Sequence, residues 1–351
     1  NGNMTSDFLS QLREIDGERW LFLARGVLPA KQDIPQAKKL SIALAGCYTV
    51  RKYDTVTGEI SALQATVENQ RTRCTVTLWD HDSLLLRLTP VSAAAAHDAV
   101  PEVAAHKAHL PLRIPSQLAF RLEEPNVLLL DKAEFRLDGS EWEPEEELLR
   151  LDNILRRRLG WPESGGRAAQ PYCIPKGPAV HRLALRIRIF SEMTSPAVAL
   201  ATEHPETVSI RWNGLCAPNE PDGFYVDHDI HRIPLPPLQK GENLLELEMP
   251  FEKRVPLEWI YLLGNFGVEI RGSDKRIVPL PDTLGFGSIT SQGLPFYSGK
   301  LIYLLPVILE QPGRVRLHAP QFRAALLELA ADDGPDGAPS AFSPYTAQTG
   351  V

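Results

Sequence analysis

The chain has 351 residues, enough for two or three domains of ordinary size. Lys and Arg number 37 against 44 Asp and Glu, a net charge of -7, which argues against a nucleic-acid partner held by general basicity. Hydrophobic residues make up 43% of the chain, and its 30 prolines outnumber its 24 glycines. Because proline interrupts helices and central strands, this composition favours many short strands joined by turns.

The cysteines and the apolar runs argue against three further classes: disulfide-rich, zinc-binding and membrane-spanning proteins. Four cysteines, Cys47, Cys74, Cys173 and Cys216, are too few and too scattered for a disulfide framework, and no Cys-x-x-Cys pair indicates a structural zinc site. The longest apolar run, residues 301–309, is far short of the ~20 residues of a membrane helix. The first residues lack the basic and apolar regions of a signal peptide. We expect no cofactor, no metal, no nucleic acid and no membrane partner, and the compartment stays open between bacterial cytoplasm and secretion.

The first block, residues 1–92, is predicted to be a β-sandwich. Apolar and polar residues alternate with a period of two in several short runs, which is typical of half-buried strands. These runs are Arg19–Ala24, Leu40–Leu44, Cys74–Trp79 and Ser83–Leu88. Residues 93–116 then change to an Ala-, His- and Pro-containing composition, which predicts a linker.

Two further β blocks follow the linker. Residues 117–275 contain the apolar runs 127–130, 183–189, 208–212 and 244–248, and predict a jelly roll. Residues 276–351 predict a second β domain with strands at 301–305 and 314–317. We expect this last domain to be truncated, since no closing strand is evident after the Gly- and Pro-rich passage 332–340. The predicted fold class is therefore mainly β, with consecutive sandwiches.

One short amphipathic helix is predicted within the middle block, at residues 143–160. Leucines recur there at three- and four-residue spacing, at Leu148, Leu151, Leu155 and Leu159, and make one apolar stripe. Pro144 suits a first helical turn and Gly160 a position just past the helix end. The acidic beginning and the arginine run 156–158 match the helix dipole and are expected to be solvated helix ends.

A polar stretch, Phe224–His231, is the strongest candidate for a binding surface. Read as one strand, it places Tyr225, Asp227, Asp229 and His231 on one face. Such a face suits a sugar, because the tyrosine ring stacks on it and the carboxylates accept hydrogen bonds from hydroxyl groups. Ordinary alternation in a half-buried strand gives the same pattern and is its more common origin. Two aspartates also fall short of the six or more oxygens that Ca²⁺ needs.

Trp259 is a second candidate carbohydrate contact, as an aromatic residue with polar neighbours, although tryptophan in a sandwich more often belongs to the core. Catalytic signatures are missing: the sequence has no His-Glu-x-x-His, no phosphate-binding loop and no Gly-x-Ser-x-Gly. A hydrolytic carboxylate pair meets in space and not in sequence spacing, so the sequence singles out no pair among the 44 acids.

Several segments resemble accessory domains of glycoside hydrolases. Residues 11–24, with 53–59 and 82–86, look like the β-sandwich that follows the catalytic barrel of large members. The middle block is similar to galactose-binding-like jelly rolls of family 2-type hydrolases and their rhamnosidase-like relatives. The similar pieces there are Trp212–Gly214, Asp222–Asp227, Lys240–Leu247 and Glu258–Val268. Residues 292–300 resemble the entry to the family 2 sugar-binding domain, and residues 342–345 its later Pro-Tyr element.

This resemblance implies a non-catalytic accessory region of a glycoside hydrolase. Its catalytic domain would lie upstream of Asn1 in the parent chain and would be the main partner, so the resemblance supplies no catalytic residue for this sequence. Carbohydrate is the expected ligand, with Tyr225, Asp227, Asp229 and Trp259 as its expected contacts. Two alternatives stay open: a stand-alone hydrolase that uses paired carboxylates, and a structural or oligomerisation module without a ligand.

Overall fold

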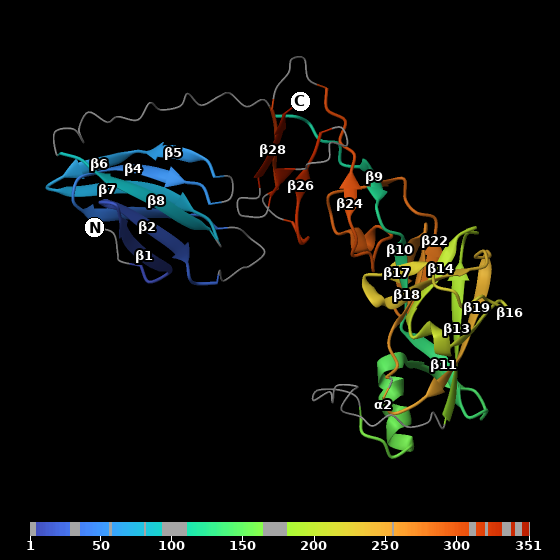
Figure 1. Cartoon of the computed structure of the whole chain (residues 1–351). Helices are drawn as coiled ribbons and strands as arrows, with labels where there is room; N and C mark the ends of the chain where they lie inside the picture. The colour runs from blue at the N-terminus through green and yellow to red at the C-terminus, as the bar shows by residue number, and fades with distance from the viewer. Residues whose placement is uncertain are drawn as a thin grey trace. The chain divides into compact units, whose positions relative to one another are not determined.

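A computed structural model of the chain shows a mainly β protein with a single α-helix in its described part (Figure 1). The described residues are 5–28, 36–55, 58–80, 82–92, 111–163, 181–254, 256–308, 314–319, 322–331, 338–340 and 346–350. The mainly β fold class with one short helix is confirmed. The chain forms two compact units, one of residues 1–111 with 308–351, the other of residues 112–307. Residues 93–110 of the predicted linker, Cys173 and the segment 342–345 lie outside the described residues.

The first unit contains a sandwich of two antiparallel sheets. The five-stranded sheet has the order β1 (Phe8–Ile15), β2 (Glu18–Arg25), β8 (Ser83–Pro90), β4 (Tyr48–Tyr53) and β5 (Ile60–Leu63). The three-stranded sheet has the order β3 (Lys38–Ala45), β7 (Arg71–Leu78) and β6 (Ala65–Glu68). One apolar core joins both sheets, with Leu21 and Leu86 from the larger and Ile42 and Val76 from the smaller. Strand β7 alternates exposed and buried residues throughout, as its sequence predicts.

The same unit also includes two short strand pairs near the C-terminus. Strand β25 (Arg314–His318) pairs with β28 (Thr346–Gly350), and β26 (Glu328–Leu329) with β27 (Ala338–Pro339). Strand β28 lies in a stretch where the sequence predicts no strand. The segment Thr-Ala-Gln-Thr-Gly has no large apolar residue and gives no strand signal of its own.

The second unit is a larger sandwich. Its five-stranded sheet has the order β10 (Asn126–Leu130), β20 (Ile260–Gly264), β14 (Val198–Glu203), β18 (Asp227–Leu235) and β17 (Gly223–Tyr225). The eight-stranded sheet runs β12 (Glu143–Glu147), β11 (Lys132–Leu137), β13 (His181–Ser191), β19 (Gly241–Phe251), β15 (Ser209–Trp212) and β16 (Leu215–Cys216). Its other two strands are β21 (Gly267–Arg271) and β22 (Asp274–Val278), and β22 pairs in parallel with β13. Leucines and isoleucines from both sheets, with the fully buried Trp212, form the core.

A small third sheet completes this unit. Strand β9 (Leu118–Leu122) lies between β23 (Thr283–Leu284) and β24 (Leu301–Tyr303). The division predicted between residues 275 and 276 falls within strand β22. The predicted domain boundaries themselves stay predictions.

The helix is confirmed, but it begins later than predicted. Helix α2 spans Leu148–Arg158, and Leu148, Leu151 and Leu155 are buried as the leucine spacing predicts. Glu143–Glu147 is strand β12 instead of a first helical turn. Pro144 lies at a register shift on this edge strand, where the missing N–H breaks no ladder hydrogen bond.

The arginine run at the helix end is only partly solvated. Arg157 and Arg158 are exposed and pair with Glu163 and Glu143. Arg156 is only 4% exposed, and its Nε donates to Oδ2 of the buried Asp152 at 2.7 Å. The expectation that the whole run is a solvated helix end is therefore wrong for Arg156, because the residue at this position faces the core.

Candidate functional site

The segment Phe224–His231 is a hairpin and not the single strand predicted. Strand β17 ends at Tyr225, Val226 has a φ of +62°, and β18 begins at Asp227. Tyr225 therefore lies opposite Asp227 across the hairpin, and Phe224 lies opposite His231. A β-branched residue rarely adopts positive φ, so the sequence gives no turn signal at Val226.

The two predicted aspartates lie in the exposed part of this hairpin. The backbone N–H of Asp229 donates to Oδ1 of Asp227 at 2.9 Å, which shapes the turn. Both side chains are exposed. The Phe224 ring packs on His228 with the ring centroids 4.1 Å apart. The structure therefore places Asp227 and Asp229 beside the turn and not in line with Tyr225.

Tyr225 meets a second tyrosine on the surface of the five-stranded sheet. Its ring centroid is 5.2 Å from that of Tyr261, at an angle of 54°. Both rings are half-buried against small apolar side chains of the sheet, with Ala201 directly opposite Tyr261 on β14. Burial raises the pKa of both phenols, and in Tyr261 the neighbouring Tyr225 adds to the effect. Both hydroxyl groups are therefore protonated at neutral pH.

Two glutamates accompany the tyrosines. Loss of water around its carboxyl group raises the pKa of the partly exposed Glu258, and the charges of Glu203 and Asp152 raise it further. The charges of Glu258 and Glu203 also raise the pKa of Tyr261. We call Tyr225, Tyr261, Glu203 and Glu258 the tyrosine patch. Only Tyr225 among them is predicted from the sequence. The others reach it through the antiparallel pairing of β14 and β20, which no local sequence pattern reveals.

The indole N–H of Trp259 takes part in a hydrogen bond that stabilises helix α2. Its indole Nε1 donates to Oε1 of Glu147 at 2.9 Å, and the residue is 41% exposed. Glu147 is the N-cap of helix α2 and accepts hydrogen bonds from the backbone N–H groups of Leu149 and Arg150. The polar end of Trp259 therefore stabilises the beginning of the helix, while its ring stays accessible two residues from Tyr261.

This cap makes stability depend on pH. Burial alone would raise the pKa of Glu147, but the hydrogen bonds from Trp259, Arg150 and Leu149 outweigh it and lower the pKa below 4.5. Its stabilising effect is thus complete above pH 4.5 and lost as the pH falls through the folded-state value. We expect Glu147→Ala to cost about 1–2 kcal/mol at pH 7. Urea unfolding measures this loss.

The loss in Glu147→Ala should shrink at acidic pH, because the wild-type carboxylate is then protonated as well. Glu145→Ala is the matched control, since this nearby side chain is exposed and forms a weak ion pair with Lys132 at 3.8 Å. A loss in Glu147→Ala that is constant with pH would contradict the assignment.

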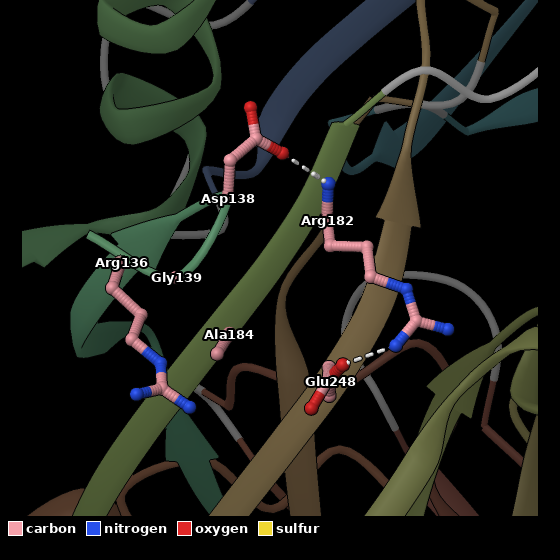
Figure 2. Close-up of a pocket in the computed structure, with 6 residues that line it drawn as sticks. All are labelled: Arg136, Asp138, Gly139, Arg182, Ala184 and Glu248. Atoms are coloured by element: carbon pink, nitrogen blue, oxygen red, sulfur yellow. Dashed lines mark hydrogen bonds and ion pairs between the residues drawn. The ribbon is translucent and has the colours of Figure 1, made fainter.

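A separate hollow lies on the outer face of the eight-stranded sheet (Figure 2). It is open to solvent and has a volume of about 450 Å³. Its lining residues are Arg136, Asp138, Gly139, Arg182, Ala184 and Glu248. Ala184 lies between longer side chains, with Arg136 on one side and Arg182 and Glu248 on the other (Figure 2). The hollow exists because this one outward position of β13 carries a small residue.

Most charges around this hollow already have partners. The Arg182 guanidinium donates to Glu248 at 2.6 Å, and the Arg182 backbone N–H donates to Asp138 at 2.8 Å. The hydrogen bond with His181, followed by that from Arg182, lowers the pKa of Asp138. Arg136 stacks on Trp142 at 4.9 Å. No residue that the sequence predicted for sugar binding lines this hollow.

Within the described ranges, no three His, Cys, Asp or Glu side chains are grouped so that they could hold a metal ion. None of the described helices is long and apolar enough to cross a membrane.

Comparison with known proteins leaves the chain without an assigned family. No family model matches it, and no curated protein does. Among solved structures, the rhamnosidase from Novosphingobium sp. PP1Y matches 73% of this chain at 12% identity and a TM-score of 0.19. An anti-sigma factor domain-containing protein matches 76% of this chain and 84% of its own, at 11% identity and a TM-score of 0.20. The chain spans 25% of the rhamnosidase's length. At these TM-scores neither match assigns a fold or a function to this chain, and the galactose-binding-like assignment stays a prediction.

Proposed function

We propose that this chain is a non-catalytic accessory region of a glycoside hydrolase, and that its tyrosine patch holds carbohydrate against the sandwich of residues 112–307. The observation that carries the proposal is the pair of half-buried rings, Tyr225 and Tyr261, beside two glutamates. The wider role, supporting an upstream catalytic domain, rests on the resemblance of residues 212–268 to such regions.

The chemistry of the patch suits a sugar. A pyranose presents C–H groups that pack on aromatic rings, and hydroxyl groups that need hydrogen-bond acceptors and donors. The tyrosine rings offer the apolar contact, their protonated hydroxyls donate, and carboxylate oxygens of Glu203 accept. Asp227 and Asp229 are proposed as outer contacts from the exposed hairpin turn, and the accessible ring of Trp259 as a further stacking surface.

Hydrolysis is the second candidate function, and one observation favours it. Loss of water, followed by the charges of Glu203 and Asp152, raises the pKa of Glu258. Glycoside hydrolases use a carboxylic acid with a raised pKa together with a second carboxylate. The two functions separate experimentally, because release of aglycone from aryl glycosides would require Glu258 and binding without turnover would not.

The test begins with a glycan array, followed by titration calorimetry on any sugar that binds. We expect Tyr225→Ala and Tyr261→Ala each to weaken binding about tenfold, the loss of one aromatic contact of about 1.4 kcal/mol. Phe224→Ala is the matched control: this neighbouring ring is 51% exposed and packs on His228, outside the patch, so binding should not change.

Equal binding by all three variants would overturn the assignment of the patch. Binding to no glycan at all would favour the structural alternative. Turnover of an aryl glycoside that Glu258→Gln abolishes would establish the chain as an enzyme.

A further inference from the structure

Strand β1 is a long edge strand with apolar side chains in solvent. It pairs with β2, and no other described strand lies on its opposite edge. Leu9, Leu12 and Ile15 are 67%, 53% and 54% exposed. An edge of eight residues with three exposed apolar side chains is a ready template for another strand. The opposite edge strand, β5, has only four residues and one such side chain, Ile60.

The hydrogen-bonding pattern shows which backbone groups β1 offers. The N–H of Gly26 donates to the carbonyl of Asp7 at 2.8 Å, and the same register continues along β1 and β2. Backbone groups of successive residues point to opposite edges in an antiparallel ladder. The odd-numbered residues of β1 therefore bond to β2. Phe8, Ser10, Leu12 and Glu14 direct their N–H and C=O groups outward.

We propose that β1 binds β1 of a second copy of this chain, antiparallel and edge to edge, with Leu12 on a twofold axis perpendicular to the sheet. Leu12 then lies opposite the partner's Leu12, on the side of the sheet that carries the core residue Leu21. Leu9 lies opposite the partner's Ile15 on the other side, and the symmetry repeats this pair. All three exposed apolar residues of the strand find apolar partners.

Charges select the same register. With Leu12 on the axis, Ser10 lies opposite the partner's Glu14, and Gln11 lies opposite the partner's Arg13, so no like charges meet. Moving the axis one residue toward the C-terminus places Arg13 opposite Arg13, which is unfavourable. Moving it one residue toward the N-terminus places Leu9 opposite Arg13. Registers with the axis between two residues are excluded, because opposite side chains must share a face of the sheet.

The assembly joins the five-stranded sheets of two copies into one continuous sheet. The outward N–H and C=O groups of both β1 strands are then hydrogen-bonded. A closed twofold dimer uses both β1 edges and leaves only the short β5 strand at each end of the joined sheet. This differs from the proposed sugar contact, which lies in the other unit of the chain.

The first experiment measures mass in solution. The chain should sediment at equilibrium with twice its mass of 39.0 kDa, over concentrations reaching about 100 µM, enough to populate a dimer of micromolar Kd. Leu12→Arg should return it to one mass, because two arginines would then meet on the axis. Leu215→Arg is the control, since Leu215 is 65% exposed on β16, and it should leave the dimer intact.

The second experiment tests the register itself. Cys216 is the exposed native thiol among the described cysteines, so it and Cys173 are replaced by serine. In that background, Gln11→Cys and Arg13→Cys chains should form a disulfide-linked dimer rapidly when mixed and oxidised. Each variant alone should cross-link at least tenfold more slowly.

A chain of single mass at every concentration would overturn the proposal. So would a dimer that survives Leu12→Arg, or one in which Gln11→Cys alone cross-links as fast as the mixture. If Leu215→Arg lowered the mass in solution to that of one chain, the interface would lie in the unit of residues 112–307 and the proposal would be wrong.

Discussion

Replacing Arg156 with methionine is expected to lower the free energy of unfolding by about 3–5 kcal/mol, because it leaves the charge of Asp152 buried without its partner. Asp152 and Arg156 are 1% and 4% exposed. Besides their mutual hydrogen bond, Asp152 accepts from the N–H of Leu257 at 3.3 Å, and Arg156 donates to the carbonyl of Lys253 at 2.9 Å. The pair thus ties helix α2 to the segment that leads into strand β20.

The matched control is Arg157→Met, one residue along the same helix. Arg157 is exposed and pairs with the exposed Glu163 at 3.2 Å, so its loss should cost less than about 1 kcal/mol. Adding Asp152→Asn to Arg156→Met should recover part of the loss, because the buried charge is then removed while the amide oxygen still accepts from Leu257. Urea unfolding followed by tryptophan fluorescence measures all three. Equal losses in the two arginine variants would contradict the buried-charge explanation.

Asn243→Ala is expected to cost about 2–4 kcal/mol, because it leaves several buried polar groups without partners. Asn243 is fully buried. Its Oδ1 accepts from the N–H of Gln239 at 2.9 Å and from Nδ2 of Asn213 at 3.0 Å, and its Nδ2 donates to the carbonyl of Gln239 at 2.7 Å. Asn213 in turn accepts from the N–H of Leu244.

Glu242→Ala is the control for this variant. Glu242 precedes Asn243 on β19, and its exposed side chain pairs with Arg188 at 2.9 Å, so a loss below about 1 kcal/mol is expected. Thermal unfolding monitored by circular dichroism compares the two. If both variants melted together with the wild type, the two turns would be held by backbone geometry alone.

Asn213 and Asn243 also show which structural features can be predicted from the sequence and which cannot. An Asn-Gly pair favours a hairpin turn, and Asn213 and Gly214 both have positive φ between strands β15 and β16. Asn243 holds a second turn, before strand β19, through its two hydrogen bonds to the backbone of Gln239. That the two turns bond to each other was not visible, because 30 residues separate the side chains in sequence. Local patterns predict the elements, but the contacts between them depend on the register of the sheets.

The same limit explains the errors. The leucine stripe of helix α2 was correct because periodicity is local, while the strand at Glu143–Glu147 depends on pairing with β11. The prediction of a single strand at Phe224–His231 was wrong because a β-branched residue such as Val226 seldom forms a turn. In the candidate site, Tyr225 was found from its own segment. Tyr261 of β20, Glu203 of β14 and Glu258 in the segment before β20 meet it only in the folded sheet.

The place of β9 has a consequence for how the second unit is made. Leu122 of this early strand pairs with Leu301, and Asn126 donates to the carbonyl of Gly293. During synthesis from the N-terminus, Leu122 and Asn126 cannot pair with residues 301 and 293 until nearly the whole unit has been synthesised. Pairings so distant in sequence slow folding. A nascent chain halted before Leu301 should therefore remain protease-sensitive at β9, and full protection should arrive late, when the last strand of the unit leaves the ribosome.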